Sequence, residues 1–122
     1  MKLIFVYNVN SGLWNSAFGS AHKVLSPSTY KCNLCSLTYG AFKENIIWKQ
    51  FRESTNVEMD FYHLNEFKKA FPKLNLDKFQ FPVVLKSIGD KIEALLTKKT
   101  LDDIKEVDEL IGVLRKNIPE NE

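Results

Sequence analysis

A short, continuous apolar run near the start of the chain constrains the fold more than any other feature of the sequence. Residues 3–7 carry no charge, and the segment 8–12, which contains two Asn, one Ser and one Gly, follows them directly. A run this short, bounded by turn residues, indicates a strand that is buried on both faces rather than a helix. A strand of that kind lies at the centre of a sheet covered by helices, so we expect an α/β fold.

Size and composition indicate one compact domain. The chain has 122 residues, and 44% of them are hydrophobic. This is enough apolar material to build a core without disulfide bonds, so we expect residues 1–122 to form a single domain.

Charge and hydropathy narrow the classes of partner. The formal charge is +2, and basic residues come at most in pairs. Nucleic-acid binding usually needs clustered positive charge, so we expect no nucleic-acid partner. No apolar run approaches the length of a membrane span, and no cleavage site follows the first run, so we expect a cytoplasmic protein without a membrane partner.

Periodicity and turn residues predict the other elements. Asn65 and Thr100 are expected to cap the helices that follow them. In chain order we expect a helix over residues 13–25, a long loop or one helical turn over 26–41, a helix around 46–52, a strand over 57–63, a short helix over 65–71, strands over 79–85 and 92–96 joined by a turn at 89–90, and a helix over 101–118.

Cys32 and Cys35 are the chain's only cysteines, and two residues separate them. In a reducing compartment such a pair is more often redox-active or metal-binding than a static bridge. An inert, buried pair is the third interpretation. All three stay open at this point, and none of them names a substrate. The alternative to redox chemistry is a metal-binding or non-catalytic interaction module that uses the same cysteines.

The order of elements, apart from one extra helix, resembles the thioredoxin-like and more narrowly the glutaredoxin-like fold. In that fold a proline with a cis peptide bond opens the third strand beside the active site, and residues 81–85 (FPVVL) are similar to that element. The resemblance implies a single thioredoxin-like domain, with a central four-stranded mixed sheet flanked by helices. It also implies a cis Phe81-Pro82 bond and a substrate contact at these two residues. The stretch 22–40 is similar, in addition, to short uncharacterised bacterial proteins with a Cys-x-x-Cys motif.

The position of the cysteines departs from the family. In thioredoxin-like enzymes the Cys-x-x-Cys motif follows the first strand, but here residues 8–12 occupy that place. If the first two helices both run back from the C-terminal edge of the sheet, the loop over 26–41 must return to that edge. We therefore expect Cys32 and Cys35 to lie at the same edge as Pro82, where open α/β sheets place their ligands.

The redox interpretation assigns a role to each cysteine. Cys32 is the expected attacking thiolate because it is the N-terminal member and because Lys31 precedes it, and Cys35 is the expected resolving thiol. The partner would be a protein or small-molecule thiol or disulfide, with no cofactor. We expect the two sulfurs to be close enough to bridge and at least one of them to be reachable by solvent.

The metal interpretation requires further ligands. The only histidines, His22 and His63, complete a Cys2His2 zinc set with Cys32 and Cys35 on paper. His63 is expected at the C-terminal edge of the sheet and His22 at the opposite edge, so one cysteine pair can hardly meet both. His63 is the expected neighbour if the cysteine loop reaches the C-terminal edge, and His22 is the expected neighbour if the loop does not reach it.

Overall fold

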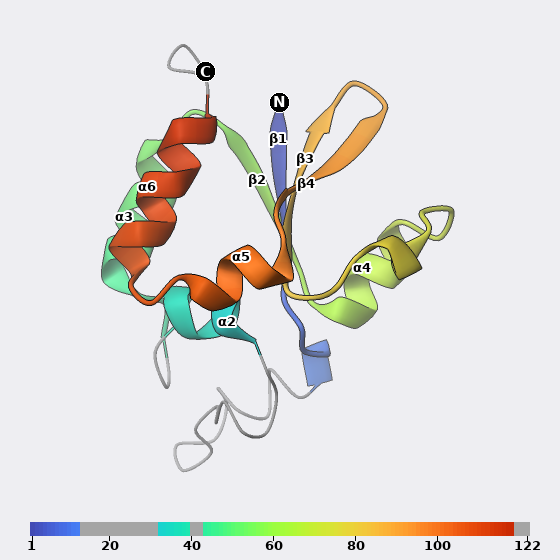
Figure 1. Cartoon of the computed structure of the whole chain (residues 1–122), viewed down its shortest axis with the longest axis horizontal. Helices are drawn as coiled ribbons and strands as arrows, with labels where there is room; N and C mark the ends of the chain where they lie inside the picture. The colour runs from blue at the N-terminus through green and yellow to red at the C-terminus, as the bar shows by residue number, and fades with distance from the viewer. Residues whose placement is uncertain (13–31, 40–42, 119–122) are drawn as a thin grey trace.

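The computed structural model describes residues 1–12, 32–39 and 43–118, and shows a twisted open sheet with helices on both faces (Figure 1). Its elements are β1 (Lys2–Val6), α2 (Asn33–Thr38), α3 (Ile46–Ser54), β2 (Glu58–Tyr62), α4 (Leu64–Ala70), the 3-10 turn η1 (Leu76–Lys78), β3 (Val83–Ile88), β4 (Lys91–Leu96), α5 (Lys98–Asp103) and α6 (Val107–Asn117).

The sheet has four strands in the order β2-β1-β3-β4. β1 pairs in parallel with β2 and antiparallel with β3, and β3 pairs antiparallel with β4. The predicted central four-stranded mixed sheet flanked by helices is therefore confirmed, with the first strand inside the sheet and β4 at its margin. The hairpin turn also lies where it was expected, since Gly89 has the positive φ of 58° that such a turn favours.

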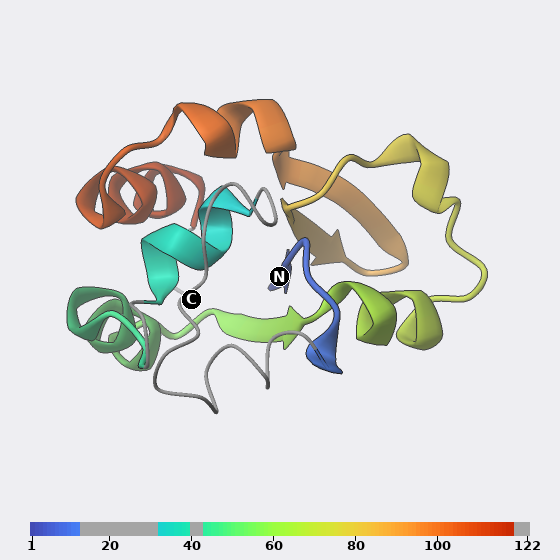
Figure 2. The same cartoon turned by 90° about the horizontal axis from the view of Figure 1, so that it is seen from below.

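Alternating side chains of β1 build two cores, one on each face of the sheet. Leu3 and Phe5 face the larger core, which α2, α3, α5 and α6 cover. Ile4 and Val6 face the smaller core, where Phe67 of α4 packs against β3. Figure 2 shows the same division, with α4 on one side of the sheet and the other helices on the opposite side. Both faces of β1 are buried, as its unbroken apolar run predicts.

The segment that carries the cysteines is not a plain loop. Cys32 is the N-cap residue of α2, whose last residue is Thr38. Of the two expectations for residues 26–41, the short helical turn is the one that the described part of this segment bears out. The helix expected over 13–25 lies outside the described residues.

The predicted single helix over 101–118 is wrong. The structure has two helices, α5 and α6, and Ile104 between them takes an extended conformation with φ −82° and ψ 127°. The apolar spacing of the sequence continues across this break because the larger core receives residues from both helices, including Leu101 and Leu110. Hydropathy alone therefore does not reveal the break.

Two predicted helix caps and one strand boundary are also corrected. The N-cap of α4 is His63 rather than Asn65, and the N-cap of α5 is Thr97 rather than Thr100. β3 begins at Val83, so residues 79–82 precede the strand instead of belonging to it. In the described part of the chain, no helix has both the length and the apolar character that crossing a membrane requires.

Candidate functional site

Cys32 and Cys35 are joined by a disulfide at the start of α2. Their sulfurs are 2.08 Å apart and their Cα atoms 5.3 Å apart. Cys32 is the N-cap residue, and Cys35 is the third residue of the helix. One turn of helix brings positions three apart onto the same side, so the local fold itself places the two thiols together. The expectation that the sulfurs can bridge is confirmed.

Two backbone N–H groups point at the sulfur of Cys32. The N–H of Cys35 donates to Cys32 Sγ over 3.3 Å, and the N–H of Asn8 donates over 3.4 Å. The first donor belongs to the opening turn of α2, and the second follows the end of β1. Hydrogen-bond donors of this kind favour the charged form of an acceptor, so they would stabilise a thiolate on Cys32.

The side chain of Asn33 fastens the motif to the break between α5 and α6. Its Nδ2 donates to the carbonyl oxygen of Leu101 over 2.5 Å and to that of Ile104 over 2.8 Å. These carbonyls lie at the C-terminal end of α5, where a helix has no further turn to supply donors. Asn33 therefore donates hydrogen bonds to carbonyls at the end of α5, as the N–H groups of a further helical turn would have done.

The other end of α2 is held by a buried polar contact. Thr38 is fully buried, and its hydroxyl donates to the carbonyl oxygen of Leu34 over 2.8 Å. The hydroxyl of Tyr7 lies 3.4 Å from Thr38 Oγ1. Burial raises the pKa of Tyr7 well above its ordinary value, because a phenolate would be poorly solvated there. Tyr7 is thus a neutral, structural group that connects the end of β1 to α2.

Both cysteines are buried. Only 4% of the surface of Cys32 and 1% of that of Cys35 is exposed. The expectation that one sulfur is reachable by solvent is therefore wrong for this disulfide-bonded structure. The reason is packing, since both residues belong to the larger core together with Leu34 and Leu37.

The Phe81-Pro82 bond is cis, as predicted. Pro82 directly precedes Val83, which pairs with Val6 at the end of β1. The Asn8 N–H that reaches Cys32 lies two residues beyond that same strand end. The structure therefore brings the cysteines and the cis proline to one edge of the sheet. The ring of Phe81 turns into the smaller core, where it packs against Phe67 with 6.0 Å between ring centroids.

His63 serves the start of α4. Its Nδ1 lies 2.7 Å from Glu66 Oε1, and its backbone N–H donates to the same oxygen over 2.8 Å. That backbone donor is the main reason why the pKa of Glu66 lies below its usual value. Among the described residues, no three His, Cys, Asp or Glu side chains form a group that could hold a metal ion. His22 and Lys31, which the sequence also pointed to, lie outside those residues.

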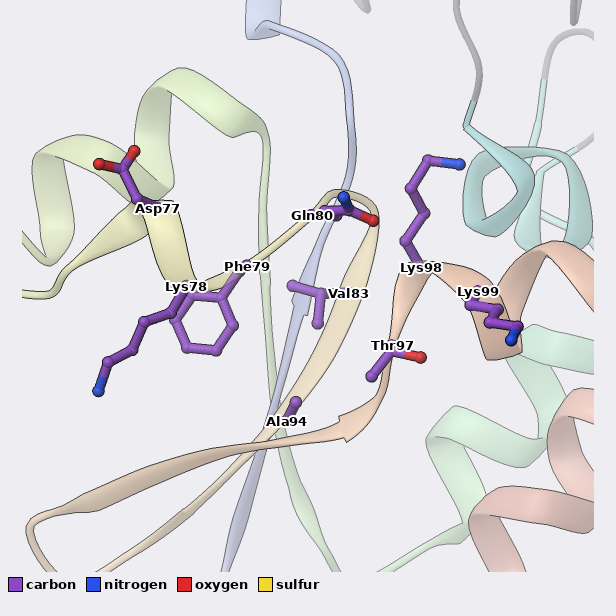
Figure 3. Close-up of a pocket in the computed structure, with 9 residues that line it drawn as sticks. All are labelled: Asp77, Lys78, Phe79, Gln80, Val83, Ala94, Thr97, Lys98 and Lys99. Carbon is purple, nitrogen blue, oxygen red and sulfur yellow. The ribbon is translucent and has the colours of Figure 1, made fainter.

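A separate cleft of about 300 Å³ lies where η1, β3, β4 and the start of α5 meet. Val83, a residue of the smaller core, contributes to its lining, and neither Cys32 nor Cys35 does. Figure 3 shows that the ammonium groups of Lys78, Lys98 and Lys99 extend in different directions rather than toward one point. Lys98 is also paired with Asp102. The cysteine pair therefore remains the candidate site. The cleft is lined by Asp77, Lys78, Phe79, Gln80, Val83, Ala94, Thr97, Lys98 and Lys99.

Sequence reasoning missed two contributors to the site. The Asn8 N–H is a backbone group, and no side-chain pattern reveals where it points. Asn33 stands between the cysteines, but its partners are carbonyls about seventy residues away, at separations of 68 and 71. A polar amide at the first position of a helix was the only available signal, and it does not specify a partner.

Comparison with protein-family models, with curated proteins and with solved structures finds no match for this chain.

Proposed function

We propose that the protein carries out thiol–disulfide exchange through Cys32 and Cys35, with Cys32 as the attacking thiol. The observation that carries the proposal is the hydrogen bonding of Cys32 Sγ, which accepts from the N–H groups of Cys35 and Asn8. Of the two sulfurs, Cys32 is thus the one whose thiolate has backbone donors in place. The resemblance to thioredoxin-like proteins and the position of Pro82 at the same sheet edge add support.

The reaction proceeds in two exchanges. The Cys32 thiolate attacks one sulfur of a substrate disulfide, a Cys32–substrate disulfide forms, and the first substrate thiolate leaves. The Cys35 thiolate then attacks Cys32 Sγ, the Cys32–Cys35 bond forms, and the second substrate thiolate leaves. Two electrons pass from the protein to the substrate, and no cofactor takes part.

The partner in this proposal is a protein or small-molecule thiol or disulfide, and the compartment is the cytoplasm. Phe81 and Pro82 remain the proposed substrate contact. Because the ring of Phe81 packs on Phe67, the contact would be made by the backbone next to Pro82 and not by the aromatic ring. Because both cysteines are buried, the first turn of α2 must move away from the core before a substrate sulfur can approach Cys32 Sγ.

Single-cysteine variants test the assignment. Cys35→Ser leaves Cys32 alone, and Cys32→Ser leaves Cys35 alone. Serine at position 32 is itself a good N-cap residue, so α2 is expected to persist in the second variant. Each reduced variant is mixed with glutathione disulfide, and the mixed disulfide is followed by mass spectrometry. We expect Cys32 to react about threefold faster or more, because a larger thiolate fraction at neutral pH outweighs the lower nucleophilicity of each thiolate.

Equal rates, or a faster Cys35, would contradict the assignment of Cys32. Circular dichroism of both variants serves as the control that they are folded.

The metal alternative is tested by metal analysis of the wild-type protein, purified without a histidine tag. One zinc ion per chain that is lost in both variants would replace the exchange proposal with a metal-binding one.

A further inference from the structure

We propose that Asn33 is a positioning residue that sets the stability of the Cys32–Cys35 disulfide by anchoring the first turn of α2 to the end of α5. This inference rests on the proposed exchange function. Asn33 touches neither sulfur, so its effect passes through the backbone that carries both cysteines.

The anchor joins the motif to a distant part of the chain. Asn33 Nδ2 lies 2.5 Å from the carbonyl oxygen of Leu101 and 2.8 Å from that of Ile104. Both carbonyls are held in place, because Leu101 is fully buried and Ile104 is 6% exposed. Asn33 is covalently linked to Cys32, and its amide bonds therefore restrict the backbone on which Cys32 stands.

Apart from the bond of the Asn8 N–H to Cys32 Sγ, the other hydrogen bonds of this turn are local. The hydroxyl of Ser36 donates to the Cys32 carbonyl oxygen over 3.4 Å, and the Ser36 N–H donates to the same oxygen over 3.2 Å. These bonds begin and end within α2 and cannot fix the helix relative to the sheet. A helix of six residues is too short to be stable by itself, so external contacts must define its first turn.

Restraint of the first turn favours disulfide formation. When the pair closes, two thiols lose two protons and two electrons to glutathione disulfide, which becomes two glutathione molecules. A first turn that is already fixed loses little conformational entropy in this step, whereas a loose turn loses more. Removal of the anchor should therefore shift the equilibrium toward the dithiol.

The test compares the full-length wild type with Asn33→Ala in glutathione redox buffers. We expect the equilibrium constant for disulfide formation to fall about threefold to tenfold, which the loss of these two hydrogen bonds is large enough to produce. At 29.6 mV per tenfold, the midpoint then moves by about 15–30 mV to a less negative potential. Asn33→Gln keeps an amide and should shift the midpoint in the same direction but by less.

Asn45→Ala is the matched control. Asn45 Oδ1 accepts from the N–H groups of Ile47 and Trp48 at the start of α3, over 2.9 and 3.1 Å. Its removal also costs two amide hydrogen bonds and lowers the stability of the protein, but it leaves α2 and its anchor in place. We expect the midpoint of this variant to equal that of the wild type.

An Asn33→Ala midpoint that equals the wild-type value, or that moves no further than that of Asn45→Ala, overturns the inference and leaves the exchange function standing. If Asn33→Ala does not fold, an unshifted Asn33→Gln midpoint overturns it in the same way. A wild-type pair that fails to equilibrate with the buffer overturns the proposed function and this inference together.

Discussion

Reduction of the Cys32–Cys35 disulfide is expected to lower the free energy of unfolding by about 2 kcal/mol while the fold persists. The two cysteines are only three positions apart in sequence. In the chain-entropy description, a cross-link that closes so short a loop removes little freedom from the unfolded chain, which amounts to roughly 2 kcal/mol. The core does not depend on the bond, because both faces of β1 are packed by side chains from other elements.

The measurement is urea unfolding with and without a strong reductant, followed by the fluorescence of the tryptophans and by far-ultraviolet circular dichroism. The double variant Cys32→Ser/Cys35→Ser is the control for effects of the reductant itself. It should unfold with nearly the same midpoint as the reduced wild type. Loss of the folded baseline on reduction, or a decrease above about 4 kcal/mol, would mean that the bond is a structural staple and would refute this reasoning.

Three further predictions follow from local contacts. Thr38→Val removes the buried donor to the Leu34 carbonyl and should cost about 1 kcal/mol in urea unfolding, whereas an unchanged midpoint would show that this hydroxyl adds nothing. The His63 N–H is the main cause of the lowered pKa of Glu66, so the stabilisation by the Glu66 carboxylate is present above its unfolded pKa of 4.5 and is lost as the pH falls through the lower folded pKa. Glu66→Gln should therefore flatten the decline of the free energy of unfolding below about pH 4.5, and equal pH dependence in the variant and the wild type would contradict this. In Gly89→Ala the added Cβ has no atom within 4 Å, but the residue must keep a φ of 58°, so the free energy of unfolding should fall by about 1 kcal/mol. A stabilised variant would refute the strain argument.

The sheet could be predicted from the sequence because its signals are local. The apolar run over 3–7, the alternation that begins at Val57 and the turn at Gly89 each act through neighbouring residues. The cis bond before Pro82 was predicted from a family resemblance and is present. These features decide which strands are buried and where they turn, and pairing follows from them.

The errors concern points where distant groups decide a boundary. The break between α5 and α6 lies at carbonyls that accept hydrogen bonds from Asn33. The apolar spacing within residues 101–118 gives no information about a donor in another helix. His63 replaces Asn65 as the N-cap of α4, while the side chain of Asn65 pairs with Ser11 instead. In each case an amide side chain satisfies a backbone group that lies far away in sequence.

The sequence draws attention to the cysteine pair but does not describe its environment. Spacing alone identified Cys32 and Cys35, and the structure adds the bond between them. Burial of both cysteines was only one of three open interpretations, because Leu34 and Leu37 do not reveal from sequence that the short helix turns its cysteines into the core. The Asn8 donor depends on the path of the chain after β1, which has no side-chain signature.

The midpoint potential of the wild-type pair tests the central claim most directly. The fraction of disulfide is measured by alkylation and mass spectrometry after equilibration in glutathione buffers at pH 7. A pair that takes part in exchange should follow a two-electron curve with a midpoint between about −120 and −270 mV, the range of known exchange proteins. A midpoint below about −300 mV, where structural disulfides resist the glutathione pool, would contradict the account.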